Sequence, residues 1–258
     1  MDTRTGAGYS ASWTTEGTSG ETPMTEQDWL EINDPRLMLE YLRGKASDRK
    51  LRLFACACCR QVWHLLTDKR SRLAVETAER YADGEATDAI LAAVNNDASG
   101  ARANAREPGW PNPGWRNSKW EAAGAADWAT ALDDTLAVAT YAAGSAREAA
   151  GIDSRYGWAT AKAKQAALLR EIFDNPFRPM TGNSSWLTWH DRTVPRLAQA
   201  AYEERHLPEG TLDNSRLAIL ADALEEAGCT DQYILDHCRS GGEHVRGCWV
   251  VDLVRSVD

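Results

Sequence analysis

The sequence has few phenylalanines and no long apolar run. Of its 258 residues only 3 are Phe, against 11 Trp and 7 Tyr, and hydrophobic residues make up 43% of the chain. No stretch of roughly 18 apolar residues occurs, so we expect no membrane-spanning helix. The apolar content is nevertheless too high for a wholly disordered chain, and the length fits one large or two small domains.

Positive charge is in the minority: Lys and Arg number 29, Asp and Glu 38, and the formal net charge is −9. Non-specific nucleic-acid binding requires a basic surface, so we expect no duplex nucleic-acid partner. The charge is uneven, however. Residues 36–80 contain 11 basic and 5 acidic side chains. Residues 208–258 contain 4 basic and 10 acidic side chains.

Two interpretations of this charge asymmetry remain open. In the first, the two segments pack together and their charges meet across the contact, and the remaining charges form an ordinary solvated surface. Alternatively, the densest basic cluster docks an acidic protein partner; its members are Arg43, Lys45, Arg49, Lys50 and Arg52.

Residues 1–23 lack periodic apolar positions and are rich in Ser, Thr and Gly, which predicts a disordered arm. Met24 is a second possible start, so the sequence leaves open whether this arm is translated. The arm also lacks a charged segment followed by an apolar one, so no secretory signal is visible and we expect a cytoplasmic protein with reduced thiols.

Helix signals dominate the rest of the chain. Asn33-Asp34-Pro35 and Ser47-Asp48 are typical helix starts, and apolar residues recur every three or four positions between 51 and 65. Residues 85–173 are rich in Ala, with a Pro/Gly loop at 107–115 and expected breaks near Asp133 and Gly151. Further helices are predicted from Thr193, Asn214, Thr230 and His244.

These signals predict an all-α fold, an irregular bundle of about nine helices. We expect a single domain over residues 24–258, with an Ala-rich variable centre at 85–173 and a C-terminal helical subdomain at 192–258. No fixed repeat period is present, which excludes a regular solenoid.

The Pro/Gly loop contains Trp110 and Trp115. Trp is enriched at the energetic centres of protein interfaces, so the loop is a candidate interaction surface. The alternative is that these rings pack over the Ala-rich helices, where Ala leaves space.

The six cysteines fall into two groups, and the second of these contains no Cys-x2-Cys pair. Cys56, Cys58 and Cys59 lie on one predicted helix and are expected to be buried. The second group provides five metal-ligand side chains within residues 229–248, namely Cys229, His237, Cys238, His244 and Cys248. Zinc accepts four such ligands, so this group is a candidate zinc site; ordinary core packing is the alternative.

Two further features of the second group bear on its chemistry. If residues 244–248 are helical, His244 and Cys248 share a face. Cys238 also follows His237 directly, and a thiol beside an imidazole base is the arrangement of a thiol-dependent enzyme, a more distant alternative. No phosphate loop, nucleophile elbow or dinucleotide fingerprint occurs.

Three segments carry a resemblance to known proteins: LRLFACACCR at 51–60, NPFRP at 175–179 and HVRGCWVVDL at 244–253. Through them the chain resembles a paralogue-rich, uncharacterised bacterial family of helical proteins, over residues 24–258. That resemblance implies a helical fold and no particular activity. Residues 216–228 are also faintly similar to the bacterial repeat-companion domain.

We therefore expect a non-enzymatic helical module that binds an unidentified protein partner and needs no cofactor. The alternative is a small zinc-binding metalloprotein with ligands near its C-terminus. The sequence does not decide the oligomeric state.

Overall fold

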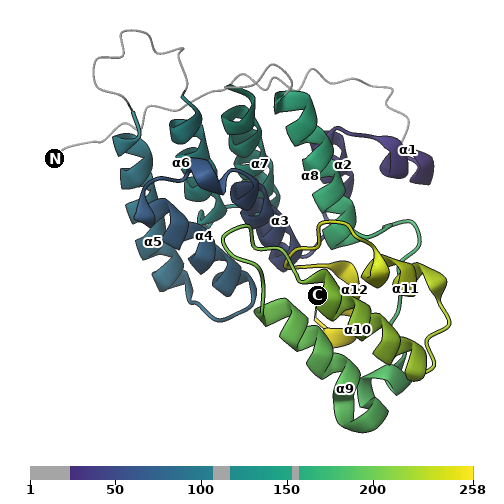
Figure 1. The fold of residues 1–258 in the computed structure, drawn as a ribbon. Helices are drawn as coiled ribbons and strands as arrows, with labels where there is room; N and C mark the ends of the chain where they lie inside the picture. Colours follow the sequence, from purple (N-terminus) through teal and green to yellow (C-terminus); the bar gives the residue numbers. More distant parts are fainter. Residues whose placement is uncertain (1–23, 107–116, 153–156, 258) are drawn as a thin grey trace.

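The computed structural model describes residues 24–106, 117–152 and 157–257 (Figure 1). Within them the chain forms twelve α-helices, one short 3-10 helix (η1) and no strand, so the all-α prediction is confirmed and the predicted number of about nine helices is too low. The elements are α1 (Glu26–Glu31), α2 (Pro35–Leu42), α3 (Asp48–Gln61), η1 (Trp63–Leu65), α4 (Lys69–Ala82), α5 (Asp88–Asn104), α6 (Ser118–Ala129), α7 (Thr135–Ile152), α8 (Gly157–Phe173), α9 (Ser184–Glu203), α10 (Asn214–Glu226), α11 (Gln232–Arg239) and α12 (Trp249–Arg255).

Local capping chemistry explains where most helices begin. The Asp34 and Ser47 side chains accept hydrogen bonds from the first-turn amides of α2 and α3, as their sequence predicts. Two predicted starts are wrong by one residue. Asp213, not Asn214, caps α10, and Asp231, not Thr230, caps α11, because each aspartate accepts from the amide two residues on.

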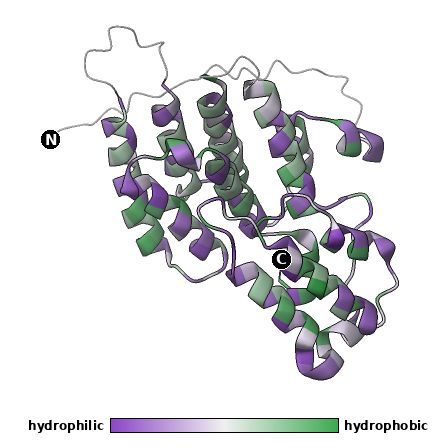
Figure 2. Cartoon of the chain, viewed as in Figure 1, coloured by the Kyte–Doolittle hydropathy of each residue, from purple (hydrophilic) through white to green (hydrophobic). Residues whose placement is uncertain are grey.

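Helix α3 lies at the centre of the first of two hydrophobic cores. All of its residues from Leu51 to Arg60 are buried, including the three cysteines, as predicted. Helices α4, α6, α7 and α8 pack around it, and α6 and α7 contribute mainly alanines to this core. Because Ala side chains are short, these helices approach closely. Purple and green alternate along most helices, the pattern of amphipathic helices that bury one side (Figure 2).

The second hydrophobic core lies among α9–α12, the lower part of the molecule in Figure 1. Within α9, the residues Trp189 to Arg192 have non-helical backbone angles, and the helix resumes at Thr193, where the sequence predicts a start. The first part of α9 begins already at Ser184, before that predicted start.

The last helix begins later than predicted. Residues 244–248 are not helical, and α12 starts only at Trp249. Gly247 explains the difference, because its φ of +89° forms a turn that a helix cannot contain. His244 and Cys248 therefore do not share a helix face.

Candidate metal centre

Four side chains of the described chain form a group whose geometry suits a metal ion. They are Glu171 near the end of α8, His237 in the last turn of α11, and His244 and Cys248 in the loop before α12. One potential ligand atom from each lies within 4.8 Å of all the others. Three of the four belong to the predicted zinc set, and Glu171 is new.

Backbone hydrogen bonds hold the loop at residues 244–248 in place. The amide of Leu212 donates to the His244 carbonyl at 2.8 Å, and the Cys248 amide donates to the Val245 carbonyl at 2.9 Å. At the turn, a Cβ on Gly247 would lie only 3.2 Å from Leu53 Cδ1. The loop is therefore pressed against the first core, next to α8.

The distances within the group are short. His244 Nδ1 lies 3.1 Å from Glu171 Oε1, and His237 Nε2 lies 3.4 Å from Glu171 Oε2. His237 Nε2 is also 3.3 Å from Cys248 Sγ. Donor atoms bound about 2.0–2.3 Å from a tetrahedral zinc lie roughly 3.3–3.8 Å from one another, so small shifts would place all four around one ion.

The group is shielded from solvent. Glu171, His244 and Cys248 are buried, and the His237 side chain is 17% exposed. Burial, followed by the nearby Glu171 carboxylate, raises the pKa of the Cys248 thiol well above its ordinary value. Burial also lowers the pKa of His237. For His244, burial also acts to lower the pKa, but the hydrogen bond to Glu171, the attraction of its charge and a hydrogen bond at Ser240 together outweigh burial and raise the pKa.

Each histidine also has an outer hydrogen-bond partner. Ser240 Oγ lies 3.0 Å from His244 Nε2, and the Trp249 indole N–H donates to His237 Nδ1 at 3.2 Å. Such partners orient the rings and determine which nitrogen carries the proton. The imidazoles of His237 and His244 meet edge to face, with centroids 4.8 Å apart.

Two predicted metal ligands lie outside the group. Cys229 and Cys238 are buried in the second core, and neither belongs to the four-residue group. Burial raises the pKa of Cys238 to about 12. Three of the five predicted ligands therefore lie together in this group, with Glu171 as its fourth member. Glu171 was missed because it lies in another part of the chain, in a helix with no ligand spacing.

Cys238 and His237 do not form the thiol–imidazole pair that a thiol-dependent enzyme requires. The His237 ring contacts Cys248 instead. All six cysteines are buried, and burial is the first cause of the raised pKa of every one of them. Catalytic thiols require a thiolate and access to substrate.

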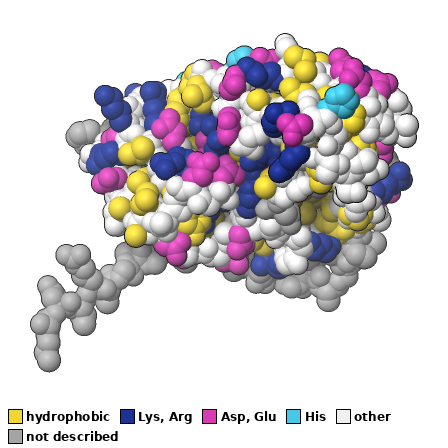
Figure 3. Space-filling model, turned by 90° about the horizontal axis from the view of Figure 1, so that it is seen from below, with side chains coloured by type: hydrophobic (Ala, Val, Ile, Leu, Met, Phe, Trp, Pro, Cys, Tyr) yellow, Lys and Arg dark blue, Asp and Glu magenta, His cyan; other side chains and the backbone are white. Residues whose placement is uncertain are grey.

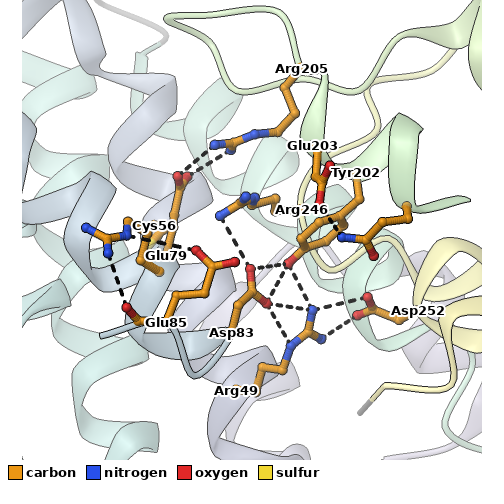
Figure 4. Close-up of polar contacts among 12 residues, drawn as sticks. Arg49, Cys56, Glu79, Asp83, Glu85, Tyr202, Glu203, Arg205, Arg246 and Asp252 are labelled. Atoms are coloured by element: carbon orange, nitrogen blue, oxygen red, sulfur yellow. Dashed lines mark hydrogen bonds and ion pairs between the residues drawn. The ribbon is translucent and has the colours of Figure 1, made fainter. Parts of the chain in front are cut away.

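The predicted basic docking cluster is engaged partly within the protein (Figure 4). Arg49 pairs with Asp252 at 2.6 Å and Asp83 at 3.0 Å, and it donates to the Tyr202 hydroxyl at 2.9 Å. Arg52 is buried and donates to two backbone carbonyls at and just beyond the C-terminal end of α6. Of these contacts, the Arg49–Asp252 pair joins the basic and acidic segments, as the packing interpretation of the charge asymmetry expects.

The remaining members of the cluster lie nearer the surface. Arg43 pairs with Glu40 at 2.8 Å, and the Lys45 ammonium lies 3.3 Å from the centre of the Tyr41 ring. Lys50 is half-buried. Seen from below, Lys and Arg side chains lie interspersed with Asp and Glu (Figure 3). Docking of an acidic partner on this cluster stays a prediction.

Trp110 and Trp115 lie outside the described residues, as does the predicted arm at 1–23, so the interaction role of this loop also stays a prediction. None of the described helices is both long and apolar enough to cross a bilayer. No protein-family model, curated protein or solved structure matches this chain. The resemblance to a bacterial helical family therefore rests on the sequence segments alone.

Proposed function

We propose that this protein binds one zinc ion through Glu171, His237, His244 and Cys248. The observation that carries the proposal is the convergence of one carboxylate, two imidazoles and one thiol within 4.8 Å. Zinc accepts all three donor types. Calcium and magnesium prefer oxygen ligands alone, and copper(I) prefers sulfur ligands, so the mixed set favours zinc over these ions.

The charges of the proposed site balance. A glutamate and a cysteine thiolate carry two negative charges, and two neutral imidazoles add none, so a divalent ion makes the assembly neutral. An uncompensated charge in a buried position is costly, and zinc removes this cost when it displaces the thiol proton.

The proposed role is structural. Four protein donors fill a tetrahedral site and leave no open position for a substrate, which is the rule for structural rather than catalytic zinc. The donors come from α8 in the first core, from α11 in the second core, and from the loop before α12. In this loop Val245 belongs to the first core and Cys248 to the second. The ion therefore links the two cores. His244 also lines a surface pocket together with Lys164 and Gly242.

Metal analysis of the purified full-length chain tests this proposal. After growth with added zinc and dialysis, we expect close to one equivalent of zinc, because structural zinc binds tightly. Cys248→Ser should lose most of it. Cys238→Ser is the matched control, since this cysteine is equally buried but lies outside the group.

Two results would overturn the proposal. One is less than about a tenth of an equivalent in the wild type together with no binding of added zinc, given the affinities expected of structural sites. The other is equal zinc content in Cys248→Ser and the wild type. Cobalt(II) substitution gives an independent measure, because a thiolate-to-metal absorption band should appear in the wild type and be absent in Cys248→Ser.

A further inference from the structure

We infer that Trp249 is a latch on the metal site: its hydrogen bond to His237 and coordination of an ion by His237 exclude each other. The inference rests on the proposed function and concerns how that site is regulated. It follows from the different outer partners of the two histidines.

The Trp249–His237 contact assigns the proton of the His237 ring. An indole N–H is a donor only, so His237 Nδ1, which lies 3.2 Å from it, must accept and cannot carry a proton. In the neutral ring the proton is then on Nε2. That is the atom facing Glu171 at 3.4 Å and Cys248 at 3.3 Å.

Metal coordination requires the other tautomer. An ion held among these four side chains takes the lone pair of His237 Nε2, so the ring proton moves to Nδ1. Two N–H groups then face each other across the 3.2 Å that separates His237 Nδ1 from the Trp249 nitrogen. They cannot share a hydrogen bond, so the indole or the imidazole has to turn away.

His244 has no such conflict. Its Nδ1 faces Glu171, and its Nε2 lies 3.0 Å from the Ser240 hydroxyl. When Nδ1 binds an ion, the proton of this ring moves to Nε2. A hydroxyl both donates and accepts, so Ser240 keeps its hydrogen bond by reversing its role. Of the two outer hydrogen bonds, therefore, only the one from Trp249 is lost when the site binds a metal ion.

Movement of the Trp249 indole would also affect residues outside the metal site. The Trp249 ring is 5% exposed and stacks on Tyr233 with centroids 5.2 Å apart. The Tyr233 hydroxyl donates to Asp174 Oδ1 at 2.6 Å, just past the end of α8. The latch therefore connects metal loading to the contact between α11, α12 and the end of α8.

Zinc titration against a competing chelator tests the latch. Trp249→Phe keeps an apolar ring but removes the N–H, so the metal-free state loses one hydrogen bond and the loaded state loses the donor–donor conflict. We expect zinc to bind about two- to tenfold more tightly, the factor that one net hydrogen bond contributes. Trp186→Phe, another buried tryptophan of the second core, should leave the affinity unchanged.

A second measurement needs no variant at the site. In the ¹⁵N-labelled wild type, the indole N–H resonance of Trp249 should shift when one equivalent of zinc is added, and that of Trp186 should not. The His237 ¹⁵N shifts should report the proton on Nε2 without metal and on Nδ1 with it.

The outcomes separate the two proposals. A wild type that binds no zinc overturns the proposed function and the latch with it. A wild type that binds one equivalent, with an unshifted Trp249 resonance or with equal or weaker binding by a folded Trp249→Phe, overturns the latch alone.

Discussion

Arg49 and Asp252 are 203 positions apart in the chain and form an ion pair in which Arg49 Nη1 lies 2.6 Å from Asp252 Oδ2. Their side chains are 12% and 1% exposed. The pair joins α3 of the first core to α12 of the second. It is part of a buried charged seam that also contains Asp83, Tyr202 and Arg246 (Figure 4).

Removing one partner of this pair should destabilise the protein strongly. Arg49→Met leaves Asp252 buried without its main counter-charge, and such changes typically cost about 3–5 kcal/mol of unfolding free energy. Urea unfolding measures the effect. Arg43→Met is the control, because the Arg43–Glu40 pair is exposed and should cost at most about 1 kcal/mol. Equal losses for the two variants would show that the seam does not hold the cores together.

The Glu79 carboxylate should make the protein sensitive to acid. Burial raises its pKa, but hydrogen bonds and attraction from Arg60 and then Arg205 outweigh burial and bring the pKa below the ordinary value of 4.5. A carboxyl whose pKa is lowered by folding stabilises the protein above its unfolded pKa, and this contribution is lost as the pH falls through the folded pKa.

Unfolding measured from pH 7 to pH 3 tests this pH dependence. The stability difference between the wild type and Glu79→Gln should be largest near neutral pH. It should shrink as the pH falls below the ordinary pKa of 4.5 and then through the lower pKa of the folded state. Arg205→Gln removes one cause of the shift and should reduce the same difference. If the difference in unfolding free energy between the wild type and Glu79→Gln stays constant with pH, the lowered pKa of Glu79 is contradicted.

Gly247→Ala should damage the metal site, and Gly228→Ala should not. Both glycines have a φ of +89°, so either substitution introduces backbone strain of roughly 1–2 kcal/mol. An added Cβ at Gly247 also meets Leu53 at 3.2 Å and Ile172 at 3.4 Å, whereas nothing lies within 4 Å at Gly228. We expect Gly247→Ala to be less stable than Gly228→Ala and to bind zinc more weakly. Equal zinc affinities would show that the 244–248 turn does not position the ligands.

The native protein should resist thiol labelling. All six cysteines are buried, and the pKa of each is raised by burial, so few thiolates are present at neutral pH. A maleimide should label none rapidly in the native state and all six after denaturation. Fast native labelling of one cysteine would instead identify an accessible nucleophile.

Local chemistry by itself determined the all-α class and several of the helix starts. Capping residues such as Asp34 and Ser47 and the apolar spacing of α3 act between near neighbours in the chain, so the sequence predicts them well. It also predicts that the three cysteines of α3 are buried and that His237, His244 and Cys248 are candidate ligands. The later start of α12 was missed because glycine adopts positive and negative φ about equally readily, so the sequence alone does not indicate the φ of +89° at Gly247.

The tertiary structure alone decided which of these groups meet. Glu171 lies in α8 with no sequence signal of its own, and only the packing of α8 beside the 244–248 turn makes it the fourth member of the metal group. The same holds for Arg49 and Asp252, whose charges predict an ion pair in general but no particular partner. Attraction between charges depends on their distance in space, and the packing of the two cores sets that distance.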